Sequence, residues 1–180
     1  LLCSLFTKPG DTIFVEEPSY FLALRIFADY GLRVASIRTD EAGLVIDDLI
    51  HALNESKPKF LYIVPTFQNP SGHTLPLERR EQLVDLAKKH DFLILADEVY
   101  QFLSYTQTPP KSFGAYIDSE KVISLGSFSK ILAPGLRLGW LQTHSSILQK
   151  ITACGMLDSG GGMNPFTSVI VRSLIETGGL

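Results

Sequence analysis

The stretch FLILAD at residues 92–97 decides the fold, because an apolar run leads directly into a carboxylate. A continuous apolar run suits a strand in the middle of a parallel sheet, where helices cover both faces. A residue directly after such a strand lies at the carboxyl edge of the sheet, where open α/β folds bind ligands. The stretch therefore predicts a buried strand and a place for chemistry beside it.

Other short apolar runs alternate with longer amphipathic segments, which is the pattern of strand–helix–strand units around a mostly parallel sheet. The predicted strands are residues 12–16, 33–38, 60–64, 92–96, 121–125 and 136–142. The predicted helices are residues 20–30, 46–56, 77–90, 145–153 and 165–176, and residues 1–6 are typical of the end of another helix. We therefore predict an α/β fold, a three-layer α/β/α sandwich with a mostly parallel mixed sheet.

The composition limits the class of protein. A chain of 180 residues with 45% hydrophobic content can bury one sizeable core, so we expect one domain. The formal charge of −3 leaves no basic surplus for nucleic acid or for an anionic membrane. No apolar run reaches the roughly 20 residues that a membrane-spanning helix needs. Cys3 and Cys154 lie far apart, which predicts reduced thiols in a cytoplasmic protein and neither disulfides nor a metal site.

Polar side chains follow four of the predicted strands. They are Tyr20, Asn69, Asp97, Tyr100, Ser127, Ser129 and Lys130, with Arg137 further along the chain. Because the carboxyl ends of parallel strands meet at one edge of a sheet, we expect these side chains to converge. An aromatic ring, an amide, a carboxylate, a phenol, hydroxyls, an amine and a guanidinium together suit a flat, anionic and electrophilic ligand.

Three sequence motifs carry a resemblance to a known family. SFSK at residues 127–130 is followed by PGLRLGW at residues 134–140, DEVY stands at residues 97–100, and QNPSG stands at residues 68–72. In combination they resemble the fold type I pyridoxal-phosphate enzymes, and specifically the class I/II aminotransferases. The resemblance covers nearly the whole chain. It implies that residues 1–180 are the central, cofactor-binding part of the large domain, truncated at both ends.

By this resemblance, Lys130 holds pyridoxal 5'-phosphate as a Schiff base and then moves a proton between the substrate and the cofactor. A lysine after a buried strand suits that role, because desolvation and nearby cations lower the pKa of an amine. An arbitrary loop lysine is usually a solvated side chain. The surrounding motif is what favours the catalytic interpretation.

The same resemblance implies that Asp97 pairs with the pyridine nitrogen and keeps it protonated, so that the ring can accept electrons from the substrate. On sequence grounds an aspartate at a strand-to-helix turn is also a common helix N-cap, and that alternative stays open. The neighbouring Glu98 is predicted to be structural or solvent-facing.

Three residues match family positions around the cofactor ring. Asn69 and Tyr100 match the donors to its 3′ oxygen, and Tyr20 matches the aromatic residue stacked on the pyridine face. Each has an ordinary alternative, since an Asn-Pro-Ser-Gly sequence is often a plain turn and a tyrosine beside a strand is often a core residue.

Three others match the family's phosphate ligands. Ser127 and Ser129 offer hydroxyl donors, and Arg137 offers a planar fork that suits phosphate oxygens. A serine-rich turn that binds nothing is the alternative for the two serines.

The resemblance implies an enzyme that moves an amino group from an amino acid to a 2-oxo acid and acts as a homodimer. TFQ at residues 66–68 resembles the aminoadipate, kynurenine and regulator-associated branch. Two alternatives stay open: a lyase or decarboxylase using the same cofactor, and a ligand-sensing domain of a transcription regulator. The family's glycine-containing phosphate loop and its substrate-carboxylate arginine are absent from these residues, so we expect the chain to be incomplete as an active site.

Overall fold

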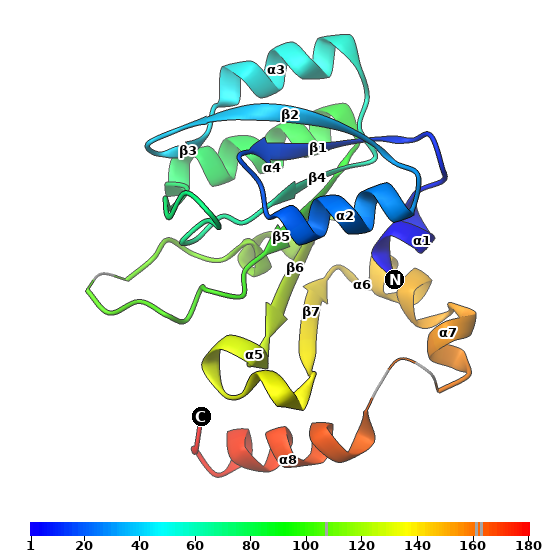
Figure 1. The fold of residues 1–180 in the computed structure, drawn as a ribbon, viewed down its shortest axis with the longest axis vertical. Helices are drawn as coiled ribbons and strands as arrows, with labels where there is room; N and C mark the ends of the chain where they lie inside the picture. The colour runs from blue at the N-terminus through cyan, green and yellow to red at the C-terminus, as the bar shows by residue number, and fades with distance from the viewer. Residues whose placement is uncertain (107, 161, 163) are drawn as a thin grey trace.

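The computed structural model describes residues 1–106, 108–160, 162 and 164–180, and within them it confirms the predicted α/β fold (Figure 1). Across these residues one seven-stranded sheet has the order β3-β2-β1-β4-β5-β6-β7. The strands are β1 (Thr12–Glu17), β2 (Arg33–Asp40), β3 (Gly43–Leu44), β4 (Phe60–Ile63), β5 (Leu93–Asp97), β6 (Val122–Ser127) and β7 (Gly139–Thr143). The five strands from β2 to β6 in this order are parallel, and the edge strands β3 and β7 are antiparallel to their neighbours.

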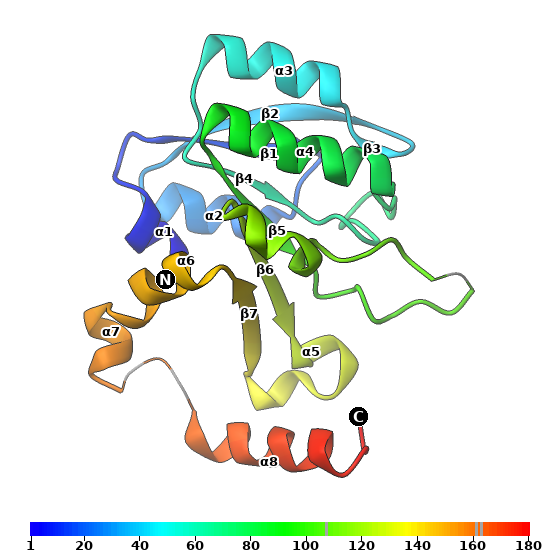
Figure 2. The same cartoon turned by 180° about the vertical axis from the view of Figure 1, so that it is seen from behind.

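Helices cover both faces of this sheet (Figure 2). They are α1 (Leu2–Phe6), α2 (Phe21–Asp29), α3 (Ile46–Glu55), α4 (Leu77–His90), α5 (Phe128–Ile131), α6 (Ser145–Thr152), α7 (Gly155–Asp158) and α8 (Pro165–Glu176), with 3₁₀ turns η1 (Phe113–Ser119) and η2 (Pro134–Leu136). Helices α3 and α4 pack on one face, and α1, α2 and α6 pack on the other. The three-layer arrangement is therefore the predicted one.

The central strand β5 shows why the apolar run at residues 92–97 is buried. Its residues alternate between the two faces of the sheet, as the two-residue period of a strand requires. Ile94 and Ala96 belong to the core beneath α3 and α4, whereas Leu95 belongs to the core beneath α1, α2 and α6. Asp97 ends the strand at the carboxyl edge.

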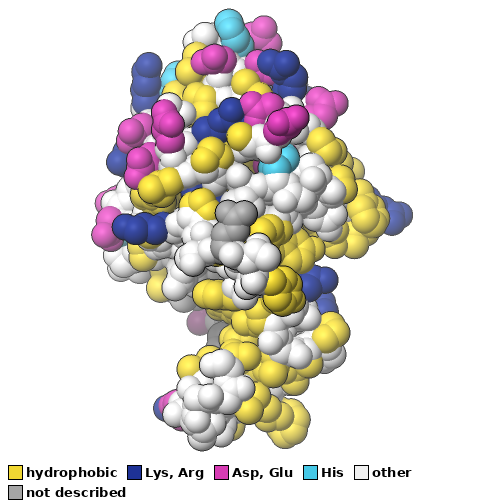
Figure 3. Space-filling view, turned by 90° about the vertical axis from the view of Figure 1, so that its left-hand side faces the viewer, with side chains coloured by type: hydrophobic (Ala, Val, Ile, Leu, Met, Phe, Trp, Pro, Cys, Tyr) yellow, Lys and Arg dark blue, Asp and Glu magenta, His cyan; other side chains and the backbone are white. Residues whose placement is uncertain are grey.

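Helix α8 lies apart from the sheet, below α5 and η2 (Figure 1). Its residues Phe166 and Val169 are 74% and 66% exposed. In Figure 3 hydrophobic side chains gather on this lower part of the molecule, whereas charged side chains gather over the upper part, near α3. None of the helices in the described part of the chain has the length and apolar character that crossing a bilayer requires.

Several boundaries differ from the sequence prediction. The strand predicted at residues 136–142 begins at Gly139, because residues 134–136 form the turn η2 and Arg137 has a left-handed backbone with φ of 50°. The short elements β3, α5, α7 and η1 were not predicted. Most of them hold too few residues to show a hydrophobic period.

Candidate active site

A cavity of about 280 Å³ lies where β4, β5 and β6 reach their carboxyl ends. Its lining includes all eight predicted site residues: Tyr20, Asn69, Asp97, Tyr100, Ser127, Ser129, Lys130 and Arg137. They come from segments that are distant along the chain, and the parallel strands bring these segments to one edge. The sequence prediction that these residues converge is thus met, while their chemical roles stay predictions.

Asp97 lies on the buried side of this cavity. The Tyr62 hydroxyl, on the neighbouring strand β4, donates a 2.7 Å hydrogen bond to Asp97 Oδ2. Burial raises the pKa of the Asp97 carboxyl, and the hydrogen bonds from Tyr62 and from the backbone of Val99 partly offset this rise. Burial and the Asp97 charge in turn raise the pKa of Tyr62, so the phenol stays a neutral donor. The chain continues from Asp97 into a turn, and the helix N-cap alternative is therefore not what forms.

Glu98 is buried, at 4% exposed, and it accepts hydrogen bonds from the Phe113 N–H at 2.9 Å and the Ser124 hydroxyl at 2.6 Å. Arg80 Nη1 lies 3.7 Å from its carboxylate, and that guanidinium also donates to the Pro65 and Leu75 carbonyls. The structural interpretation of Glu98 is confirmed and the solvent-facing one is wrong. The burial of Arg80 and Glu98 could not be predicted from the sequence, because charged residues add nothing to the hydrophobic period that marks a buried face.

Lys130 lies on the exposed side of the cavity, on the four-residue helix α5. Its Nζ lies 6.0 Å from the centroid of the Tyr100 ring. The side chain is exposed, so the described residues do not provide the desolvation that the sequence argument expected for this amine. The Ser127 hydroxyl accepts a 3.1 Å hydrogen bond from the Ser129 N–H and thereby caps α5.

The remaining predicted residues surround the space between these two sides. Asn69 Nδ2 donates a 3.5 Å hydrogen bond to the Tyr100 hydroxyl. Tyr20 is half-buried, with its ring edge against Phe21 at a centroid distance of 5.7 Å. Arg137 is exposed and donates to the Pro134 carbonyl at 3.3 Å.

Sequence reasoning missed Tyr62. In the structure the register pairs Tyr62 with Leu95, and Asp97 lies two residues further along β5 on the same face. The sequence signal was the tyrosine itself, because a polar residue inside a predicted buried strand needs a hydrogen-bond partner; which residue is the partner depends on the register.

The arrangement suits pyridoxal 5'-phosphate. The half-buried Asp97 carboxyl, whose pKa is raised by desolvation, has a neutral phenol as its partner, so a cationic ring nitrogen placed there would stabilise the charged form. An amine, two hydroxyls and a guanidinium line the opposite side, which matches an aldehyde and a phosphate.

The comparisons with known proteins agree with this geometry. Residues 1–157 match the family model described as aminotransferase class I and II, and the chain belongs to that family. It is 39% identical over 99% of its length to aromatic-amino-acid aminotransferase 1 of Thermococcus litoralis, and 34% identical over 83% to the mitochondrial kynurenine/alpha-aminoadipate aminotransferase of Bos taurus. It covers 44% and 39% of those two relatives.

Solved structures show the same relation. The chain superposes with a TM-score of 0.92 and 36% identity on a Pyrococcus horikoshii kynurenine aminotransferase in complex with PMP, covering 98% of this chain and 45% of the other. It superposes with a TM-score of 0.89 and 29% identity on LysN, an alpha-aminoadipate aminotransferase from Thermus thermophilus, covering 98% and 46%. The predicted family is thus confirmed, and the chain spans less than half the length of these relatives.

Proposed function

We propose that the whole protein is a pyridoxal-phosphate-dependent aminotransferase that moves an amino group from an amino acid to a 2-oxo acid. The observation that carries this proposal is that the half-buried Asp97 and the exposed amine of Lys130 line one cavity. Family membership supports it, and the aromatic, kynurenine and aminoadipate relatives favour donors with aromatic or long acidic side chains.

When bound, pyridoxal 5'-phosphate supplies an electron sink for the substrate. Asp97 would hold the ring nitrogen protonated, and Tyr62 orients that carboxylate through its hydrogen bond. Lys130 would bind the cofactor covalently, and its amine would hold and move the proton of the substrate α-carbon. Because the Lys130 side chain is exposed, its amine can reach both the cofactor and the substrate.

The other residues bind and orient. Asn69 and Tyr100, already joined by a hydrogen bond, would donate to the ring oxygen, and Tyr20 would cover the ring face. The cofactor phosphate falls to Ser127, Ser129 and Arg137. The two serines lie at the start of α5, where backbone N–H groups add to the donor set.

The decisive experiment incubates the full-length protein with pyridoxal 5'-phosphate, reduces the adduct with borohydride and locates it by peptide mapping. We expect the label on Lys130, its loss in Lys130→Ala and its retention in Lys150→Ala, which alters an exposed lysine of α6. Amino transfer to a 2-oxo acid acceptor is then followed with aromatic and aminoadipate donors. A label on a different lysine, or no transfer from any donor, contradicts the proposal.

One relative favours a second candidate. The chain is 30% identical over 80% of its length to YisV of Bacillus subtilis, an uncharacterized HTH-type transcriptional regulator. A ligand-sensing role predicts the same label on Lys130 without amino transfer, so product analysis separates the two functions.

We further propose that the whole protein is a homodimer and that it lies in the cytoplasm. Sedimentation of the full-length protein tests the first point, and cell fractionation tests the second.

A further inference from the structure

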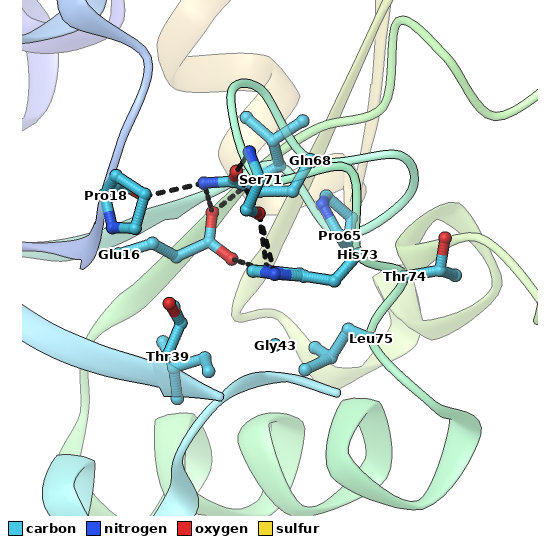
Figure 4. Close-up of polar contacts among 12 residues, drawn as sticks. Glu16, Pro18, Thr39, Gly43, Pro65, Gln68, Ser71, His73, Thr74 and Leu75 are labelled. Atoms are coloured by element: carbon cyan, nitrogen blue, oxygen red, sulfur yellow. Dashed lines mark hydrogen bonds and ion pairs between the residues drawn. The ribbon is translucent and has the colours of Figure 1, made fainter. Parts of the chain in front are cut away.

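A polar cluster built on the buried Glu16 and Gln68 lies between the segments that follow β1 and β4 (Figure 4). Glu16, at the end of β1, is 1% exposed and accepts a 2.8 Å hydrogen bond from the Val64 N–H. Gln68 is 2% exposed, and its Nε2 donates to the Pro18 carbonyl at 2.7 Å and to Glu16 Oε2 at 3.5 Å. The cluster therefore joins the segment after β1 to the segment after β4.

The oxygen of the Gln68 amide is also hydrogen-bonded. Its Oε1 accepts hydrogen bonds from the Ser71 N–H at 2.8 Å and the Ser71 hydroxyl at 2.6 Å. The same hydroxyl lies 2.7 Å from His73 Nδ1, and His73 Nε2 lies 3.8 Å from Glu16 Oε1. The four side chains thus form a closed ring. Gly43, with φ of 100°, lies against it and leaves room for the His73 ring.

Each joined segment carries a residue proposed to contact the cofactor ring. Pro18 lies two positions before Tyr20, and Gln68 immediately precedes Asn69. The amide has one favoured orientation, because a flip would place its oxygen against the Pro18 carbonyl and the Glu16 carboxylate, and its N–H group against the Ser71 N–H. The cluster therefore fixes how far apart the two segments lie.

We propose that Gln68, held by Glu16 and Ser71, is a positioning residue that sets the distance between Tyr20 and Asn69. It thereby matches the cavity to a flat ring held between a stacked aromatic face and an amide donor. This inference rests on the proposed function for the identity of the ring. The mechanical link between the two segments stands on the contacts alone.

The first test uses the cofactor-free, full-length protein, so its outcome does not depend on cofactor chemistry. Gln68→Met keeps the side chain's length and removes its hydrogen bonds. We expect backbone hydrogen exchange to rise both at residues 68–73 and at residues 16–20, about 50 positions away, with β6 unchanged. Gln82→Met, on the exposed face of α4, serves as the matched control and leaves both segments as in the wild type. Faster exchange at residues 68–73 alone overturns the link.

The second test loads the same variants with pyridoxal 5'-phosphate. We expect Gln68→Met to raise the cofactor dissociation constant about tenfold, the factor that loss of one well-placed hydrogen-bonded contact produces. We also expect it to move the pH midpoint of the bound-cofactor absorbance in the same direction as Asn69→Ala. A purely structural role changes stability without that spectroscopic shift, so an unchanged midpoint contradicts the proposal.

A gentler variant keeps the test decisive where Gln68→Met does not fold. Ser71→Ala removes one of the two bonds to Gln68 Oε1 and leaves the Pro18 contact in place. It is expected to shift both readouts in the same direction and by a smaller factor, and no shift in either overturns the proposal. Wild-type protein that binds no cofactor refutes the proposed function, whereas the exchange experiment still decides the link.

Discussion

The two sides of the candidate cavity are held in different ways. On one side, Asp97 ends the central strand β5 and Tyr62 lies within its neighbour β4. The Tyr62 hydroxyl donates a 2.7 Å hydrogen bond to the Asp97 carboxylate. On the other side, Lys130 and Arg137 lie on a four-residue helix and just after a 3₁₀ turn, and both are exposed. The chain thus holds Asp97, the proposed partner of the ring nitrogen, through its core, and it presents the amine and the guanidinium from short peripheral elements.

The exposed side has a small anchor of its own. Phe128, at the start of α5, is 9% exposed and packs on Trp140 of β7 with ring centroids 4.7 Å apart. Trp140 also covers Gly126, where any Cβ would collide with the indole. This contact orients α5 without burying Lys130. It follows that substitutions on the two sides should separate stability from function, and four variants test this.

The largest effect is expected on the exposed side. Lys130→Ala removes the proposed covalent group, and we expect the amino-transfer rate to fall on the order of 10⁶-fold, as for loss of a nucleophile elsewhere. The free energy of unfolding should stay as in the wild type, because the side chain is exposed. Steady-state kinetics and denaturant unfolding measure the two quantities. A marked loss of unfolding free energy in Lys130→Ala would contradict the proposed difference between the two sides of the cavity.

The second effect concerns the buried ion pair of Arg80 and Glu98. Arg80→Leu leaves Glu98 buried without its cation and removes the hydrogen bonds from the guanidinium to three backbone carbonyls. Removing one partner of a buried ion pair costs about 3–5 kcal/mol of unfolding free energy. Arg172→Leu, which breaks an exposed pair with Glu176 on α8, is the control and should change little. Equal losses in the two variants contradict the distinction.

The third effect depends on pH and is read in the cofactor-free protein. Burial raises the pKa of Asp97, so the folded state binds more protons than the unfolded state between the ordinary value of 3.8 and the raised value. Stability therefore falls as the pH rises through that window. We expect Asp97→Asn to be more stable than the wild type at neutral pH, with the difference disappearing below the ordinary pKa. Asp158→Asn, at an exposed position of α7, should show no such pH-dependent gap.

The smallest effect is expected at Tyr62. Tyr62→Phe removes one hydrogen bond, which costs about 1 kcal/mol. Because that bond lowers the pKa of Asp97, its loss should move the pH window of the preceding experiment upward. Tyr105→Phe, at a ring that is 91% exposed, is the matched control. A window that does not move shows that the phenol leaves the carboxyl untouched.

The sequence alone determined the α/β class, the central strand and the convergence of eight polar residues on one cavity. The physical reason is local: hydrophobic period defines strands and helices, and the carboxyl ends of parallel strands share an edge whatever their order. The tertiary structure alone decided which buried groups pair, because Tyr62 and Asp97 are 35 positions apart and Gln68 and Pro18 are 50. It also decided that Glu98 is buried and Lys130 exposed, since exposure depends on what packs over a residue.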